Sequence, residues 1–317
     1  MEEYTTPLRT NSFGFRGPEF PIERQPGELR ILFLGDSFVE AKQVKEEERF
    51  PEQTGVLLSA ILKRPVTVRA MGIGGADPPR ELLFYRRIGY QFDPDIVIQV
   101  LFPENDALPL QGNHYKFNTT GSSPTLEHLS VPIMSPCPWK CWLMAHSRLL
   151  SLAYRTLRPL WQSLSRESLS FADRLHDYFL YTTKGQQWME EEKVIDTFVG
   201  FASALQHDVT DHNGRTFFIL MPGAFEIEEW SRNTVTKQYE TTVAPSEWNS
   251  GFLLDEIAGR FREEHLLVLD LRPAFHTAKE KTNEELYFRL DPHLSRIGHN
   301  IAARTIVEFL IGQDRSL

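Results

Sequence analysis

Five short apolar runs, separated by segments with helical spacing, constrain the fold of this 317-residue chain more than any other feature. The runs cover residues 29–34, 66–70, 95–101, 216–221 and 266–270. The first, Leu29-Arg30-Ile31-Leu32-Phe33-Leu34, is nearly continuous in large apolar side chains. Such a run is typical of a strand that is buried on both faces of a parallel sheet.

Helical spacing fills the intervals between most of these runs. We expect helices over residues 50–62, 79–88, 191–206, 252–263 and 295–311. In the third of these, Val194, Phe198 and Leu205 share one helical face. Strands that alternate with helices predict right-handed crossovers and an α/β fold, with a central five-stranded parallel sheet covered on both faces.

The chain divides into a short N-terminal part and one large domain. Residues 1–27 are polar and rich in Pro and Gly, so we interpret them as an N-terminal extension. Residues 28–317 then form a single domain, interrupted by an insertion at about 107–190 that we expect to be mostly helical. The insertion carries three tryptophans and an apolar series at helical spacing: Trp139, Trp142, Trp161, Leu149, Leu150, Ala153, Leu157, Leu160 and Leu164. It fits a helical hairpin packed on the core, a lid over a site, or a surface that docks on a membrane.

Composition and charge exclude several classes of protein. With 41% hydrophobic and 24% charged residues, the chain is neither disordered nor fibrous. Its formal net charge of -9 makes nucleic acid an unfavourable partner. It has no run of about 20 apolar residues, and Met1-Glu2-Glu3-Tyr4 does not resemble a signal peptide. We therefore expect no membrane span and a cytoplasmic protein as written, or a periplasmic or extracellular one if an export or anchor segment has been removed.

The two cysteines do not indicate a metal site. Cys137 and Cys141 have no second pair with which to bind zinc, so they are two free thiols or one local disulfide. His207, Asp208 and His212 are better explained as a solvated helix end than as metal ligands. We expect no metal and no cofactor.

Four loops that follow predicted strands carry reactive side chains. They are Gly35-Asp36-Ser37-Phe38, Gly72-Ile73-Gly74-Gly75, Pro103-Glu104-Asn105-Asp106 and, before the last helix, Asp291-Pro292-His293. Each alone is explained as a turn or a helix cap. Ligands bind beyond the carboxyl ends of parallel strands, so the four loops can meet at one edge of the sheet. Together they supply a nucleophile, backbone and amide donors, a base and a carboxylate, which is what acyl transfer requires.

At these residues the sequence resembles the SGNH hydrolases, also called the GDSL esterase/lipase family. Gly35-Asp36-Ser37-Phe38 resembles the first block, Gly75 the glycine of the second block and Asn105 the asparagine of the third. Asp291 and His293 resemble the last block. The match covers about 28–106 and 190–312, and Asn11-Ser12-Phe13-Gly14-Phe15-Arg16 resembles an extension found in some members.

The chain departs from the family pattern at two positions. Pro103 stands where the third block usually has glycine, and proline has a fixed φ and no N–H. In the last block one residue fewer than usual separates Asp291 from His293. The shorter spacing resembles that in related proteins of polysaccharide O-acetylation.

The resemblance implies a flavodoxin-like three-layer α/β/α sandwich and a Ser-His-Asp triad. Ser37 would be the nucleophile, His293 the general base and Asp291 the residue that orients the imidazole. The Ser37 N–H, the Gly75 N–H and the Asn105 amide would form the oxyanion hole. His299 is a competing base that we expect to cap or pack instead, and we expect Asp36 to brace the turn.

The expected substrate is a small-molecule or carbohydrate ester, and the expected activity is that of a serine esterase. Removal of O-acetyl groups from a carbohydrate is the first hypothesis. A lipid or thioester acylhydrolase and a polysaccharide O-acyltransferase are the alternative enzymes. The alternative that is not an enzyme is a catalytically silent glycan-binding protein.

Overall fold

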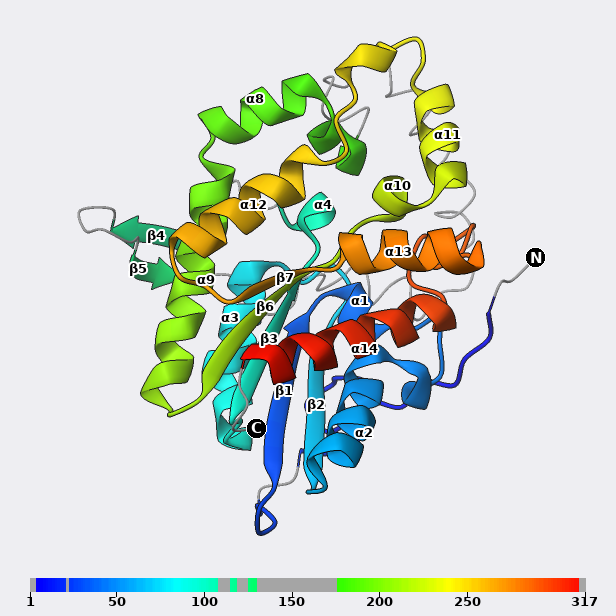
Figure 1. Ribbon diagram of the computed structural model, residues 1–317. Coiled ribbons are helices and arrows are strands. Elements are labelled where there is room, and N and C mark those ends of the chain that lie inside the picture. The colour runs from blue at the N-terminus through cyan, green and yellow to red at the C-terminus, as the bar shows by residue number, and fades with distance from the viewer. Residues whose placement is uncertain (1–3, 21–22, 108–114, 119–124, 130–175, 314–317) are drawn as a thin grey trace, which may run out of the picture.

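The computed structural model describes residues 4–20, 23–107, 115–118, 125–129 and 176–313. Its centre is a parallel sheet with the strand order β2-β1-β3-β6-β7 (Figure 1). The strands are β1 (Leu29–Gly35), β2 (Val66–Gly72), β3 (Ile96–Leu101), β6 (Arg215–Leu220) and β7 (Val268–Asp270). Counted along the chain this is the order 2-1-3-4-5, which defines the flavodoxin-like doubly wound fold. The predicted fold class is confirmed.

Side chains of the central strands alternate between two cores, one on each face of the sheet. In β1, Leu32 and Leu34 belong to one core, whereas Ile31 and Phe33 belong to the other. The first core is covered by α3 (Pro78–Arg87), α9 (Val194–Asp211) and α12 (Phe252–Glu263). The second is covered by α2 (Phe50–Leu62), α13 (Arg272–Thr282) and α14 (Arg296–Gln313) (Figure 1). The three layers follow from strands that are apolar on both faces.

Four segments of the domain differ from the sequence-based expectation. The helix expected over 191–206 is α9, which begins only at Val194 and continues to Asp211; a separate helix, α8 (Thr183–Glu191), precedes it, and Lys193 between them has a φ of 52°. Helix α13 was not expected, because Phe275 is its only buried residue and leaves little apolar periodicity. Helix α11 (Glu229–Gln238) was missed for the same reason, since it buries only Ser231 and Val235. Strand β7 begins two residues later than expected.

The insertion is not helical in all of its described parts. Strands β4 (Tyr115–Asn118) and β5 (Thr125–Leu129) form an antiparallel hairpin, which was not expected within the insertion. The 3₁₀ helix η5 (His176–Tyr181) and the first part of α8 follow as helical segments. The tryptophans Trp139, Trp142 and Trp161, the apolar series 149–164, and both cysteines lie outside the described residues.

The remaining elements are short and lie mostly in the loops at the sheet edges. They are α1 (Ser37–Glu40), α4 (Pro103–Asp106), α10 (Ala224–Ile227), η1 (Glu46–Glu48), η2 (Gly89–Phe92) and η6 (Pro245–Glu247). Helices α1, α4 and α10 each start directly beyond the carboxyl end of a strand. This is the edge at which doubly wound folds bind their ligands.

The N-terminal extension packs against the domain. Phe15 is buried in the first core, and the Asn11 side chain accepts hydrogen bonds from the backbone N–H groups of Phe13 and Phe15 at 3.1 and 3.0 Å. The buried Arg16 guanidinium donates to the carbonyls of Glu40, at 3.1 Å, and of Ala41. These carbonyls end α1, so the extension supports the helix that carries Ser37.

Across the described ranges, none of the helices has both the length and the apolar character that crossing a membrane requires.

Candidate active site

Ser37 is the first residue of α1, and only Asp36 separates it from the end of β1. Asp36 caps the helix, since its carboxylate accepts a hydrogen bond from the Phe38 N–H at 2.9 Å. The Ser37 N–H, as the first of the helix, has no intrahelical acceptor. Ser37 is half-buried, so it remains partly accessible from outside the protein.

His293 contacts Ser37 directly. Its Nε2 lies 2.8 Å from Ser37 Oγ, and its Nδ1 is hydrogen-bonded to Asp291 Oδ1. The ring also packs on Phe38, with 5.0 Å between ring centroids. The side chains of His293 and Asp291 are 25% and 29% exposed, so substrate and water can reach this line of groups. The structure thus brings together the three residues that the sequence proposed as a triad.

The short spacing of the last block has a simple geometric basis. The His293 N–H donates to the Asp291 carbonyl oxygen at 2.6 Å, which closes a three-residue turn around Pro292. The turn brings both side chains to the same side of the loop, so that Asp291 reaches His293 Nδ1 with only one residue between them. The shorter spacing of the last block is therefore compatible with a hydrogen-bonded Asp–His pair.

Two residues that the sequence analysis did not select also bind Asp291. The Tyr4 hydroxyl and the Gln43 amide donate to Asp291 Oδ2, the latter at 3.0 Å. The hydrogen bond from His293 lowers the pKa of Asp291 well below its usual value, and the bonds from Tyr4 and Gln43 lower it further against the opposing effect of burial. Asp291 is therefore ionised throughout the neutral range.

Three candidate donors lie in the loops around Ser37. Gly75 has a φ of +74°, in the left-handed region, so this loop needs glycine for its backbone conformation. The Gly75 carbonyl is held by Arg80 Nη1 at 2.7 Å, and Glu40 Oε2 accepts from the Gly74 N–H at 2.9 Å. Within the described part of the chain, the N–H groups of Ser37 and Gly75 have no acceptor.

Asn105 is tied to the first loop. Its Nδ2 donates to Asp36 Oδ2 at 3.1 Å, which leaves the second hydrogen of the amide available. Asp36 is fully buried, and this burial raises its pKa, while the hydrogen bonds from Phe38, Asn105 and Ser37 oppose the shift. Asp36 therefore braces both the turn and Asn105, in agreement with the role expected for it.

Pro103 fits the third loop because the loop continues as a helix. It is the first residue of α4, where a backbone N–H has no helical acceptor and the fixed φ of proline suits the helix. Asp106 Oδ2 accepts from the Phe102 N–H at 2.8 Å and closes the same turn. The proline at the usual glycine position thus leaves the Asn105 side chain directed toward Asp36.

His299 does not reach Ser37. It is buried in α14, stacks on Phe50 with 5.6 Å between ring centroids, and accepts at Nδ1 from the Phe50 N–H at 3.3 Å. Burial lowers its pKa to about 3, with further lowering from Arg49 and Arg16. It is a neutral packing residue, as the sequence analysis expected.

The residues 207–212 are likewise structural. Asp208 forms an ion pair with Arg86 at 2.5 Å, and the Nδ1 of His212 lies 2.7 Å from the Asp208 carbonyl. In the described ranges no group of three or more His, Cys, Asp or Glu side chains has an arrangement that could hold a metal ion.

Comparison with solved structures gives matches among esterases and lipases of the GDSL/SGNH family. The chain is similar to a putative lipolytic protein of the G-D-S-L family from Desulfitobacterium hafniense, with 12% identity over 88% of this chain and 98% of that chain, at a TM-score of 0.45. It is similar to a catalytic mutant of an acetylxylan esterase from Geobacillus stearothermophilus, with 14% identity over 89% and 94% and a TM-score of 0.45. A lipase/acylhydrolase from Enterococcus faecalis matches with 13% identity over 90% and 96%, also at 0.45. No protein-family model and no curated protein sequence matches the chain.

Proposed function

We propose that the protein is a serine acylhydrolase of the SGNH type. The observation that carries the proposal is the line Ser37 Oγ–His293 Nε2, at 2.8 Å, continued from His293 Nδ1 to Asp291. A neutral hydroxyl is a weak nucleophile, and an imidazole at this distance can take its proton during attack. The ionised Asp291 holds the Nδ1–H tautomer and stabilises the imidazolium.

The reaction then runs in two halves. Ser37 Oγ attacks the ester carbonyl carbon while its proton passes to His293 Nε2. The tetrahedral intermediate collapses, His293 returns the proton to the leaving alcohol, and the acyl group stays on Ser37. A water molecule then gives a proton to His293 Nε2 and attacks the carbonyl carbon of the acyl-enzyme. As this second tetrahedral intermediate collapses, the bond to Ser37 Oγ breaks, His293 returns the proton to Ser37 Oγ, and the carboxylic acid is released.

The developing oxyanion would be met by three donors that different loops supply. The N–H groups of Ser37 and Gly75 are free of protein acceptors among the described residues, and the Asn105 amide keeps one hydrogen after its bond to Asp36. Donors that are already fixed in place stabilise charge that appears only in the transition state. Gly74 and Gly75 are held by Glu40 and Arg80, which keeps the second loop in position.

For the substrate, we propose an O-acetyl ester of a carbohydrate. The support is the amino-acid sequence of the last block, Asp291-Pro292-His293, and of the Asn11–Arg16 segment. Both resemble the corresponding segments of proteins that modify polysaccharides. A lipid acylhydrolase would differ by preferring longer acyl chains, and an O-acyltransferase by passing the acyl group to a sugar hydroxyl in place of water.

Hydrolysis of p-nitrophenyl acetate, butyrate and octanoate tests the proposal. The wild-type protein should turn over the acetate fastest, and Ser37→Ala should lower kcat by at least about 10³-fold. Ser59→Ala is the matched control and should keep full activity, since Ser59 lies on α2 and its hydroxyl donates to the Arg64 carbonyl, away from the candidate site. Turnover that survives in Ser37→Ala would contradict the proposal, and a preference for octanoate would replace the acetyl ester by a lipid ester.

A further inference from the structure

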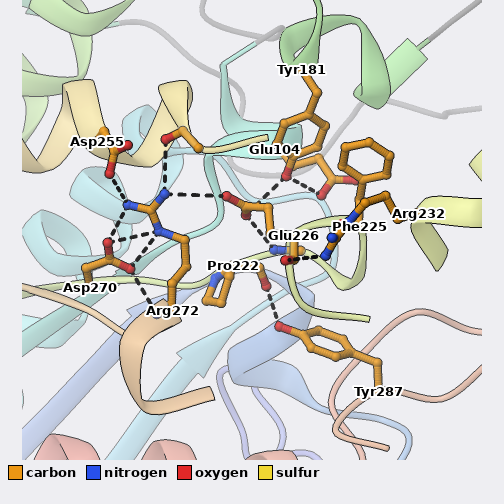
Figure 2. A network of polar contacts seen from close by, with 12 residues as sticks. Glu104, Tyr181, Pro222, Phe225, Glu226, Arg232, Asp255, Asp270, Arg272 and Tyr287 are labelled. Atoms are coloured by element: carbon orange, nitrogen blue, oxygen red, sulfur yellow. Dashed lines mark hydrogen bonds and ion pairs between the residues drawn. The ribbon is translucent and has the colours of Figure 1, made fainter. Parts of the chain in front are cut away.

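A buried polar network joins the loop of Asn105 to two distant parts of the chain. Glu104, next to Asn105 in α4, accepts a hydrogen bond from the Tyr181 hydroxyl at 2.9 Å. The same hydroxyl lies 3.2 Å from Glu226 Oε2 in α10 (Figure 2). Glu104, Tyr181 and Glu226 are 8%, 0% and 4% exposed, so bulk water does not screen them. Tyr181 is the last residue of η5, where the chain returns from the insertion.

The three side chains are packed too closely to rearrange independently. Glu226 Oε2 also accepts from the Gly223 N–H at 3.0 Å, and a Cβ at Gly223 would collide with Glu104 Oε2. The Tyr181 ring stacks on Phe225 with 4.8 Å between centroids. Because Glu104 and Asn105 are adjacent in a four-residue helix, movement of one displaces the other.

The hydrogen count at the Tyr181 oxygen requires a proton on one of the two acids. Glu226 is the acid whose second oxygen, Oε1, is buried with no hydrogen-bond partner among the described residues, which favours its neutral form. A phenol has one hydrogen to donate, yet two carboxyl oxygens lie within hydrogen-bond distance of it. If Glu226 is protonated, it can donate to the Tyr181 oxygen while Tyr181 donates to Glu104, and every contact is then attractive. If both acids are ionised, one carboxylate faces the lone pairs of the phenol in a buried site.

The groups around Glu226 do not remove this requirement. Among the described residues, Arg272 of α13 is the cation that pairs with the Glu226 carboxyl. Its Nη1 lies 3.9 Å from Glu226 Oε1, and the guanidinium is already paired with Asp270 and Asp255 at 2.5 and 2.6 Å (Figure 2). The guanidinium of Arg232 on α11 donates to the backbone carbonyls of Phe225 and Glu226, and the Tyr287 hydroxyl donates to the Pro222 carbonyl. Burial raises the pKa of Glu226 to about 8, with the Gly223 N–H and Arg272 opposing and Glu104 adding to the shift.

We propose that Glu226 carries a proton in the working protein and, through Tyr181 and Glu104, acts as a positioning residue for the Asn105 loop. The part that concerns catalysis rests on the proposed function, because Asn105 matters there as an oxyanion donor. Ionisation of Glu226 in alkaline solution would set two carboxylates against each other across Tyr181 and displace α4. The loss should fall on kcat, since the oxyanion forms after substrate has bound.

The test compares wild type with Glu226→Gln and Tyr181→Phe. Wild-type kcat for p-nitrophenyl acetate should fall several-fold between pH 7 and 9.5, whereas Glu226→Gln, which cannot ionise at this position, should show kcat that is independent of pH over the same range.

Tyr181→Phe should lower kcat about 10-fold at pH 7 with little change in KM, because the hydrogen-bonded bridge between the two acids is lost. Glu263→Gln, an exposed carboxylate at the end of α12, is the matched control and should retain the wild-type profile. An alkaline decline of equal size in wild type and Glu226→Gln would overturn the positioning role.

A second readout does not need activity. A buried acid whose pKa is raised on folding stabilises the protein at low pH, and that contribution is lost as the pH rises toward the folded-state value. The urea midpoint of wild type, measured against that of Glu226→Gln, should therefore fall between about pH 5 and pH 8 and level off above. The buried Glu81 and Asp106 titrate in both proteins, so the difference isolates Glu226. Parallel curves would refute the bound proton even if the protein proved to have no esterase activity.

Discussion

The Tyr4 hydroxyl donates a hydrogen bond to Asp291 Oδ2, although the two residues are 287 positions apart in the chain. The extension that contains Tyr4 thus contributes to the candidate triad. Hydrogen bonds from Tyr4 and Gln43 satisfy the carboxylate oxygen that does not face His293, and so fix the carboxylate in the plane that the imidazole needs.

Removing this hydroxyl should weaken catalysis without abolishing it. Tyr4→Phe should lower kcat/KM for p-nitrophenyl acetate by about 10-fold, the effect of losing one hydrogen bond to a charged group. Tyr90→Phe, at an exposed ring, is the control and should have wild-type activity. Unchanged kinetics in Tyr4→Phe would show that Asp291 is held well enough by Gln43 and His293.

Asn105 gives a sharper test of the oxyanion hole. Asn105→Ala should lower kcat by about 10²–10³-fold with a small change in KM, because the amide acts on charge that is present only in the transition state. Asn233→Ala, on the exposed face of α11, should be silent. Steady-state kinetics decide the matter, and circular dichroism would exclude loss of fold through the broken bond to Asp36. A change confined to KM would argue that Asn105 binds substrate instead.

The stability of the protein toward urea at acidic pH should depend on His299. Its folded-state pKa of about 3 lies below the unfolded value near 6.5, so the neutral ring stabilises the protein above pH 6.5 and that contribution is lost as the pH falls toward 3. The slope is about 1.4 kcal/mol for each pH unit. His299→Gln should flatten the urea midpoint between pH 6 and 4 and leave kcat at pH 7 within about two-fold of wild type. A collapse of kcat, as expected for His293→Ala, would make His299 a catalytic base after all.

The sheet was predictable from sequence because its strands are buried on both faces. Runs such as Leu29–Leu34 are apolar whichever core they meet, and their alternation with helices predicts parallel strands joined by right-handed crossovers. The flavodoxin-like strand order was implied only by the family resemblance. The hairpin β4–β5 and helix α13 were not predicted, since neither carries the periodicity that a buried face produces. Ser37 and Asn105 were found because each follows a strand that could be recognised, and His293 because it precedes the recognisable last helix.

The supports of the site could not be found in this way. Tyr4 is an isolated tyrosine in a polar extension, and no local pattern relates it to Asp291. Glu226 and Tyr181 similarly meet only because α10 and the end of the insertion return to the same sheet edge. The three-residue turn at Pro292 explains the unusual last block, but a turn of this kind is visible only once backbone contacts are known.

The most direct test of the central claim is labelling by an organophosphonate, followed by intact-mass and peptide mass spectrometry. Only a serine whose proton is taken by a neighbouring base reacts readily with such a probe. We expect one adduct per chain, located on Ser37, with none in Ser37→Ala and at least about 10³-fold slower labelling in His293→Ala. A folded wild-type protein that takes up no label, or that is labelled equally fast without His293, would contradict an activated Ser37.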